Sequence, residues 1–278
     1  MNSPKLLRND ILDDRSRALR RRIVEVLEKA GRGHVGSSLS LVEILRVLFD
    51  DILKFDPARP DWSDRDRFIL SKGHGCLALY VLLAEKGFFP EDELWKFCRE
   101  DGILGGHPEA GKVPGVEAST GALGHGLSIG VGMALAAKID RKSYRVFVVT
   151  GDGEINEGAV WEAALSAAKH GLANLTVLID YNKMQSYGPT REVLDLEPLA
   201  DKWRAFRFAT VEVDGHDVDA IRGVLNGLPG APDRPTAVIC HTIKGKGFSF
   251  AESNAMWHHK NSFKPDEISA MYRELESV

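Results

Sequence analysis

The chain has 278 residues, 44% of them apolar and 27% charged, which is ordinary for a soluble globular protein. Its net charge of −4 gives no reason to expect a nucleic-acid partner. Three cysteines without metal-ligand spacing, a charged N-terminus without a signal-peptide core and no apolar run of about 20 residues predict a reduced, cytoplasmic protein outside membranes.

Helical periodicity dominates the first half of the chain. Residues 4–30 carry apolar side chains at roughly helical spacing and end at Gly31, a typical C-cap. Further helices are expected at 41–53, after the turn 71–75 through about Glu85, from Pro90 onward, at 124–138 and from Lys264 to the end of the chain. The helix at 124–138 is rich in small residues and is expected to be buried on most sides. Residues 102–120 are expected to form a loop rich in Gly and Pro.

Short runs of β-branched and apolar residues predict buried strands. They are expected at Arg67–Leu70, Tyr144–Thr150, Leu175–Asp180, Ala209–Val213 and Thr236–Thr242. Helices separate these strands, for example at 157–170, and the alternation predicts an α/β fold with a parallel sheet and helices on both faces. Because no repeat or clear linker interrupts the pattern, residues 1–278 are expected to form a single domain.

Two polar residues directly follow two of these strands. Asp152 comes after the strand 144–150, and Asn182 comes after the strand 175–180. The helix and the strand between them are each about 20 Å long, so the chain returns to its starting level and both side chains reach the carboxyl edge of the sheet. Carboxylate and amide oxygens suit Mg²⁺ or Ca²⁺, and Gly151 and Gly153 let phosphate groups approach the backbone. The pattern predicts a metal site beside a phosphate site.

The run Gly151-Asp152-Gly153, then 28 residues, then Asn182, resembles the thiamine-diphosphate-binding motif in form and length. The resemblance implies the thiamine-diphosphate-binding fold and binding of that cofactor through Mg²⁺ or Ca²⁺. Asp152, Asn182 and the main-chain carbonyl of Met184 are the implied metal ligands.

Four histidines narrow the resemblance to one family. They are His34 in Gly33–Ser37, His74 in Ser71–Gly75, His107 in Gly105–Glu109 and His258 in Trp257–His259. These segments, and the segment Ser119–Gly126, resemble those of transketolase in the order of that enzyme, over about residues 20–265. The family segment has His followed by Gly, so His258 aligns better than His259.

The resemblance implies roles for these residues. His107 would hold the C1 hydroxyl of the donor sugar, and His34 and His258 would handle the proton on the oxygen of the aldehyde. Neutral imidazoles, with a pKa near ~6.5, suit both tasks near pH 7. The implied catalytic residues are His34, His74, His107 and His258, and the implied cofactor-binding residues are His74, Gly121, Ala122, Leu123, Gly151, Gly153, Glu154, Asn182 and His258. His170, His216 and His241 are expected to be structural.

The chain resembles only the first, pyrophosphate-binding domain of transketolase, which continues with a pyrimidine-binding domain and a third domain. The implied function is that of the N-terminal subunit of a split transketolase, which transfers a two-carbon ketol unit from a ketose or its phosphate to an aldose or its phosphate. A separate C-terminal subunit would supply the pyrimidine-binding domain in an α2β2 assembly, and the chain alone would be inactive. Glu157 is placed to face that interface, although the dipole of the helix that it begins explains a glutamate equally well.

Three other interpretations remain open. The α subunit of a 2-oxo acid dehydrogenase carries the same motif, although it would not need Gly106–Glu109 or Ser71–Gly75. Deoxyxylulose-phosphate synthase has a more similar sequence around Trp257, although it lacks the Gly-His-Pro-Glu segment and is a single long chain. A non-catalytic regulatory or scaffolding homologue could keep the fold, although the ligand and histidine positions are intact.

Overall fold

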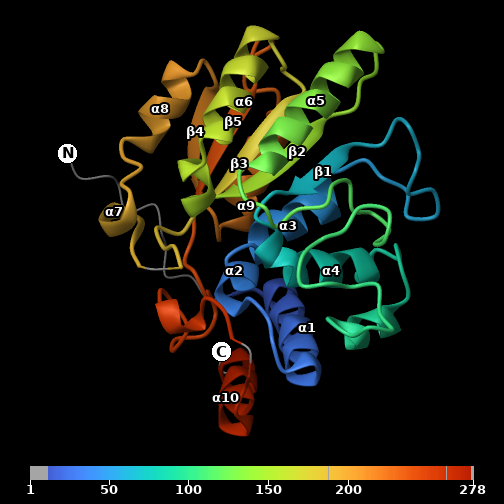
Figure 1. The fold of residues 1–278 in the computed structure, drawn as a ribbon, viewed down its shortest axis with the longest axis vertical. Helices are drawn as coiled ribbons and strands as arrows, with labels where there is room; N and C mark the ends of the chain where they lie inside the picture. The colour runs from blue at the N-terminus through green and yellow to red at the C-terminus, as the bar shows by residue number, and fades with distance from the viewer. Residues whose placement is uncertain (1–11, 187, 261, 277–278) are drawn as a thin grey trace.

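The computed structural model describes residues 12–186, 188–260 and 262–276, and its centre is a sheet of five parallel strands (Figure 1). The strands are β1 (Arg67–Leu70), β2 (Val146–Gly151), β3 (Leu175–Tyr181), β4 (Ala209–Asp214) and β5 (Thr236–His241). Their order across the sheet is β1-β2-β3-β5-β4, and every neighbouring pair is parallel. The predicted α/β class and all five predicted strands are therefore confirmed, with bounds that shift by at most two residues.

Successive side chains of each strand pack into two different apolar clusters, one on each face of the sheet. Phe147 and Val149 of β2 belong to the cluster of α1 (Asp14–Ala30), α3 (Val42–Val47), α4 (Cys76–Glu85) and α9 (Val218–Asn226). Val146 and Val148 belong to the cluster of α5 (His125–Ile139), α6 (Gly158–Lys169) and α8 (Leu199–Ala205). Because helices cover both faces, the ends of the strands are where polar groups can gather around a ligand.

The remaining elements are short or peripheral. They are α2 (Val35–Leu39), α7 (Thr190–Val193), α10 (Pro265–Glu276), a π-helical turn (Leu48–Ile52) and 3₁₀ turns at Gly73–Gly75, Glu91–Lys96, Gly153–Asn156 and Ala255–Trp257. α10 packs against α1, as Figure 1 shows. The helix predicted at 41–53 is thus an α-helix that continues as a π-turn, and the helix predicted from Pro90 is only a 3₁₀ turn.

The first predicted helix begins later than expected. α1 starts at Asp14 because the Asp13 carboxylate caps it, accepting a hydrogen bond from the Ser16 N–H at 2.8 Å. Gly31 ends the helix in the left-handed conformation, at a φ of 69°, as predicted. Residues 4–11 of that prediction lie outside the described residues.

The prediction that the helix at 124–138 is buried on most sides is wrong. Small residues line the face of α5 that meets the sheet, and a Cβ added to Gly130 would lie 2.5 Å from Val148 Cγ2. The opposite face carries Ile129 and Ile139, which are 36% and 70% exposed, and Leu165 of the adjoining α6 is 60% exposed. α5 and α6 pack on each other and together leave an apolar surface on the described part of the molecule.

The sheet register places the predicted ligands side by side. Gly151 at the end of β2 pairs with Asp180 near the end of β3, so that Asp152 and Asn182 follow neighbouring strands. β1 and β5 flank this pair of strands, and they are followed by Ser71-Lys72 and by Thr242. Four strand ends therefore meet at one edge. Among the described residues, no helix combines the length and the apolar character that crossing a membrane requires.

Candidate active site

A cavity of about 580 Å³ lies at this carboxyl edge of the sheet. Every predicted site residue except Ala122 lines it, namely His34, His74, His107, Gly121, Leu123, Gly151, Asp152, Gly153, Glu154, Asn182, Met184 and His258. Ala122 is exposed, between two lining residues. Residues 224 positions apart in sequence therefore share one cavity, which also includes Ser37, Lys72, Gln185 and Lys244, none of them predicted.

The three predicted metal ligands converge around one turn. The Asp152 carboxylate accepts hydrogen bonds from the N–H groups of Gly153, at 2.7 Å, and Lys183, at 2.5 Å. Asn182 Oδ1 accepts from the Met184 N–H at 3.1 Å. Asp152 forms no ion pair within the described chain, although it is only 3% exposed. Burial raises the pKa of Asp152 to about 7, and the neighbouring Asp180 carboxylate adds to this effect.

Asp180, which the sequence did not single out, organises the floor of the cavity. It is fully buried, and its carboxylate accepts hydrogen bonds from Lys72, from Thr242, from Ser40 Oγ at 2.7 Å and from Asn182 Nδ2 at 3.2 Å. The bond from Asn182 Nδ2 orients that amide, so that Oδ1 is the atom left for a ligand. Burial alone would raise the pKa of Asp180, but the Lys72 ammonium holds that pKa below its usual value.

Lys244 is the second cation of the cavity, and no carboxylate pairs with it among the described residues. Its side chain is nearly buried, and Nζ donates to the main-chain carbonyl of Met184 at 3.2 Å. Burial lowers the pKa of Lys244 to about 8, and the Lys72 ammonium contributes to the same shift. The cavity thus holds an unpaired carboxylate on Asp152 and an unpaired ammonium on Lys244.

These groups fit a diphosphate bound together with a divalent cation. The carboxylate of Asp152, the amide oxygen of Asn182 and the carbonyl of Met184 are all hard oxygen donors, and Lys244 matches an anion. Three buried polar atoms on the lining also lack hydrogen-bond partners within the described residues: Ser37 Oγ, Gln185 Nε2 and His258 Nδ1. Unpaired buried polar atoms are costly, so their grouping here indicates a site for a polar ligand.

Five imidazoles lie together at one side of the cavity. The His34 ring centroid is 5.6 Å from that of His74, 5.7 Å from His107, 6.1 Å from His258 and 4.5 Å from His259. Burial, reinforced by His259 and His107, lowers the pKa of His34 to about 4. Burial likewise lowers the pKa of His258 to about 3, with Lys244 as the next cause, and it lowers those of His74 and His107. The rings of His34, His74, His107 and His258 are therefore unprotonated at pH 7 and can both donate and accept hydrogen bonds.

Two loops are shaped by close backbone contacts. Gly121 has a φ of 126°, and a Cβ there would lie 2.7 Å from the His107 ring, so only glycine fits beside that histidine. The buried Glu154 carboxylate accepts from the N–H groups of Gly124 and Gly151, both at 3.0 Å, and from the Ser71 hydroxyl. Glu154, predicted to bind cofactor, therefore holds the two glycine loops in place.

A second cleft, of about 520 Å³, shares His34 and His107 with the cavity. His259 also lines it, and Arg32, Arg99 and Lys112 lie on its walls. Arg99 pairs with Asp101 at 3.0 Å and Lys112 lies 3.6 Å from Glu109, both near the surface, whereas Arg32 is exposed. The histidines therefore stand between the cavity and this second, outer cleft, which Glu100 also lines.

Comparison with known proteins gives a consistent result. Residues 13–276 match the family described as "Transketolase, thiamine diphosphate binding domain". The chain is 43% identical to one subunit of the apulose-4-phosphate transketolase of Phocaeicola vulgatus, over 90% of this chain and 89% of that protein. It is 42% identical to a 6-deoxy-6-sulfo-D-fructose transketolase subunit of a Clostridium species, over 89% of this chain and 90% of that protein.

Solved structures agree with the sequence matches. The transketolase of Pichia stipitis in complex with sedoheptulose 7-phosphate superposes with a TM-score of 0.88 at 31% identity, over 94% of this chain. The transketolase of Campylobacter jejuni superposes with a TM-score of 0.87 at 28% identity, over 95% of this chain. The chain spans 40% and 42% of the length of these two enzymes.

Replacing His34 by Gln should flatten the pH dependence of stability. An unfolded histidine takes up a proton near pH ~6.5, whereas folded His34 does so near pH 4. The unfolded state then binds more protons in this range, so the free energy of unfolding falls as the pH drops from about 6.5 towards 4. Urea unfolding at pH 7 and pH 5 should show a smaller loss for His34→Gln than for the wild type. His170→Gln, at the exposed end of α6, should lose as much as the wild type; equal losses in all three proteins would contradict the assignment.

Proposed function

The chain belongs to the transketolase family, and from this premise we propose that it is the N-terminal subunit of a split transketolase, holding the diphosphate and metal end of thiamine diphosphate. The observation that carries the proposal is that one cavity holds the Asp152 carboxylate and the Lys244 ammonium, neither of them in an ion pair among the described residues, beside unprotonated histidines. The carboxylate suits a divalent cation, and the ammonium suits a diphosphate. The histidines suit the hydroxyl groups of a sugar.

Residues on the floor of the cavity would hold the diphosphate and its metal. Asp152, Asn182 and the Met184 carbonyl would coordinate Mg²⁺, while Lys244, Ser37 and His258 would donate hydrogen bonds to phosphate oxygens. His74, which is partly buried with its ring centroid 5.7 Å from that of His258, would contact the same diphosphate. The rings of the cofactor would lie along the backbone of Gly121, Ala122 and Leu123. The phosphates would approach the backbone at Gly151 and Gly153, where no side chain is in the way.

The histidines would orient the sugar and move its protons. When bound, the cofactor supplies the nucleophilic carbon of its thiazolium ring and stores the charge of the intermediate. His107 would donate a hydrogen bond to the C1 hydroxyl of the donor. His34 and His258 would take the proton from the hydroxyl that becomes the aldehyde, and they would return it when the acceptor aldehyde is attacked. Their lowered pKa values leave these rings unprotonated at pH 7, with a ring nitrogen that can accept a hydrogen bond from the sugar.

A partner subunit would complete the site. The relatives from Phocaeicola vulgatus and Clostridium are themselves named as subunits, and this chain covers about 90% of each, whereas it covers about 40% of the solved single-chain transketolases. The apolar surface of α5 and α6 and the exposed Glu157 at the N-terminus of α6 provide a surface for such a contact. An α2β2 assembly, in which each site lies between two chains, follows from this proposal.

The outer cleft suggests the class of sugar. A ketose or aldose that enters past His259 and His107 would direct its far end towards Arg32, Arg99 and Lys112, which suit a phosphate or another anionic group. The relatives named above act, by their names, on a sugar phosphate and on a sulfo-sugar. We therefore favour anionic sugars as substrates of this chain.

The first prediction from the proposed function concerns the metal ligand Asp152. Asp152→Ala should weaken the binding of thiamine diphosphate in the presence of Mg²⁺ by at least ~100-fold, because the diphosphate charge then loses its metal anchor. Titration calorimetry on the chain with its partner subunit would measure this. Asp140→Ala, at the exposed end of α5, is the control and should bind as the wild type does. Unchanged affinity in the Asp152 variant would refute the site.

The second prediction separates substrate handling from cofactor binding. His107→Ala should retain cofactor affinity but lower kcat/KM for ketose donors by ~100-fold or more, as the loss of a positioned proton-handling group does. Steady-state kinetics with several ketoses, and with His170→Ala as the control, would test it. Wild-type kcat/KM for every ketose would count against the role of His107.

The third prediction tests the function itself. Co-expression with the protein encoded next to this chain, followed by a ketol-transfer screen, should give activity with anionic sugars that neither protein has alone. Decarboxylation of a 2-oxo acid by the pair would support the dehydrogenase interpretation instead. Cofactor binding without activity on any donor would point to a non-catalytic homologue.

A further inference from the structure

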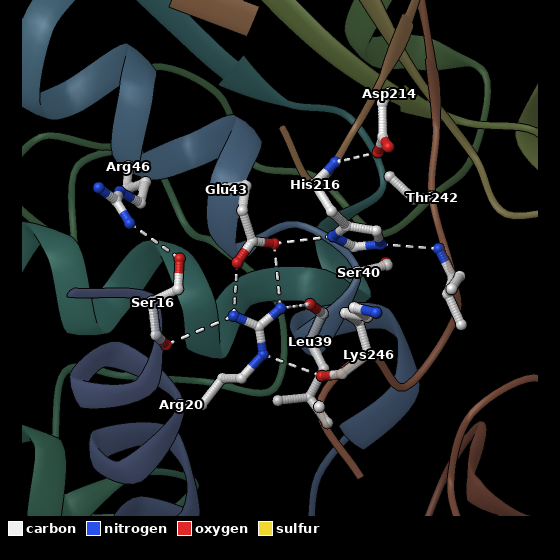
Figure 2. Close-up of polar contacts among 12 residues, drawn as sticks. Ser16, Arg20, Leu39, Ser40, Glu43, Arg46, Asp214, His216, Thr242 and Lys246 are labelled. Carbon is white, nitrogen blue, oxygen red and sulfur yellow. Dashed lines mark hydrogen bonds and ion pairs between the residues drawn. The ribbon is translucent and has the colours of Figure 1, made fainter. Parts of the chain in front are cut away.

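A buried ionic cluster lies next to the cavity but outside it. Arg20 of α1, Glu43 of α3 and His216, between β4 and α9, meet in the core, as Figure 2 shows with Glu43 between the other two. Arg20 is fully buried, Glu43 is 1% exposed, and the His216 side chain is 6% exposed. None of the three lines the cavity. His216 was expected to be merely structural.

Every polar atom of the cluster is matched. Arg20 donates from Nη1 and Nη2 to the two carboxylate oxygens of Glu43, at 2.6 and 3.0 Å. His216 Nδ1 lies 2.8 Å from Glu43 Oε2, and His216 Nε2 lies 2.8 Å from the main-chain nitrogen of Ile243. Because the Ile243 N–H can only donate, Nε2 must be the unprotonated nitrogen, and Nδ1–H then donates to Glu43. The contacts assign one tautomer of a neutral histidine.

The cluster ends on the main chain on both sides of Lys244. His216 accepts from Ile243, one residue before it, and Arg20 Nε donates to the carbonyl of Lys246, two residues after it, at 2.9 Å. The Gly245 N–H donates to the carbonyl of Gly36 at 3.1 Å, which joins this loop to α2. Residues 243–246 are thus fixed from the core side, while the Lys244 ammonium reaches the Met184 carbonyl in the cavity.

Stability alone explains such a cluster poorly. Moving a guanidinium and a carboxylate out of water has a large desolvation cost, and well-packed apolar side chains often stabilise a core as well or better. In some proteins, buried ionic groups are retained because they hold the surrounding chain in one geometry. Here the geometry imposed is that of the loop that carries an uncompensated ammonium.

We propose that Arg20, Glu43 and His216 are positioning residues, which hold the main chain around Lys244 so that its ammonium stays at the diphosphate end of the cavity. The inference rests on the proposed function, because it takes Lys244 as a contact of the diphosphate. None of the three residues touches the ligand, so their effect on it passes through Lys244.

A double-mutant cycle tests this on the full chain assembled with its partner subunit. His216→Leu leaves the Ile243 N–H without an acceptor, and the apparent Kd for thiamine diphosphate at saturating Mg²⁺ should rise by about 10-fold, as for other supporting contacts behind a ligand site. In a Lys244→Met background the same substitution should change Kd by less than about twofold, since no ammonium is left to position. His216→Gln keeps an acceptor for Ile243 and should recover part of the affinity.

The control separates positioning from general destabilisation. Asp66→Asn disrupts another buried carboxylate, which pairs with Arg145 at 2.6 Å at the opposite edge of the sheet. It should lower Tm without changing Kd. If His216→Leu does not fold, Glu43→Gln replaces it in the cycle.

Two results would overturn the inference while leaving the proposed function intact. One is an unchanged Kd in His216→Leu and in Glu43→Gln. The other is an equal increase in Kd with and without Lys244, which would mean that the cluster acts by another route. An unchanged Kd in Lys244→Met itself would instead remove the assignment of Lys244 to the diphosphate, and the inference with it.

Discussion

The buried carboxylate of Asp180 is the group on which the geometry of the site depends. It sits near the end of the central strand β3 and accepts hydrogen bonds from Lys72 after β1, Ser40 after α2 and Thr242 after β5. It also fixes the amide of Asn182 two residues further along. One anion thus joins the segments that follow three parallel strands to the C-terminal end of α2. A parallel sheet brings those segments to one edge, and Asp180 fixes their polar side chains relative to one another.

The charges around Asp180 explain which charged groups of the cavity pair with each other and which are left for a ligand. Lys72 neutralises Asp180, so the Asp152 carboxylate and the Lys244 ammonium, which form no ion pair among the described residues, are free to meet a ligand. Both side chains are nearly buried. Burial raises the pKa of Asp152 to about 7 and lowers the pKa of Lys244 to about 8. A bound cation and diphosphate would favour the charged forms of both groups. Behind Lys244, the cluster of Arg20, Glu43 and His216 supplies a second layer that the ligand does not touch.

The four predicted histidines, which share the cavity although they lie up to 224 positions apart, came from the resemblance to family segments. What residue spacing alone could anticipate was limited by sequence distance. Asp152 and Asn182 could be placed together because one βαβ unit links them and the lengths of its helix and strand can be counted. Asp180 and Lys72 are 108 positions apart, and Arg20 and Lys246 are 226 apart. Periodicity carries no information about such pairs, since a buried lysine in a loop looks the same in sequence as an exposed one.

The errors in the fold have the same kind of cause. The small apolar residues of α5 gave no strong periodicity, so its exposed face, with Ile129 and Ile139, could not be told from a buried one. The strands were located well because β-branched runs buried on both faces are distinctive. Four helices were not predicted, namely α2, α7, α8 and α9, which have only four to nine residues and so offer few turns in which a pattern can show.

We propose that this chain holds a metal and a diphosphate together between Asp152, Asn182 and Met184. Pulsed electron paramagnetic resonance with Mn²⁺ in place of Mg²⁺ tests it most directly, because phosphorus nuclei couple to a manganese ion that binds their oxygens. With thiamine diphosphate present, we expect one tightly bound Mn²⁺ per chain with clear ³¹P coupling. A tightly bound Mn²⁺ without ³¹P coupling, or cofactor binding that is indifferent to the metal, would contradict it.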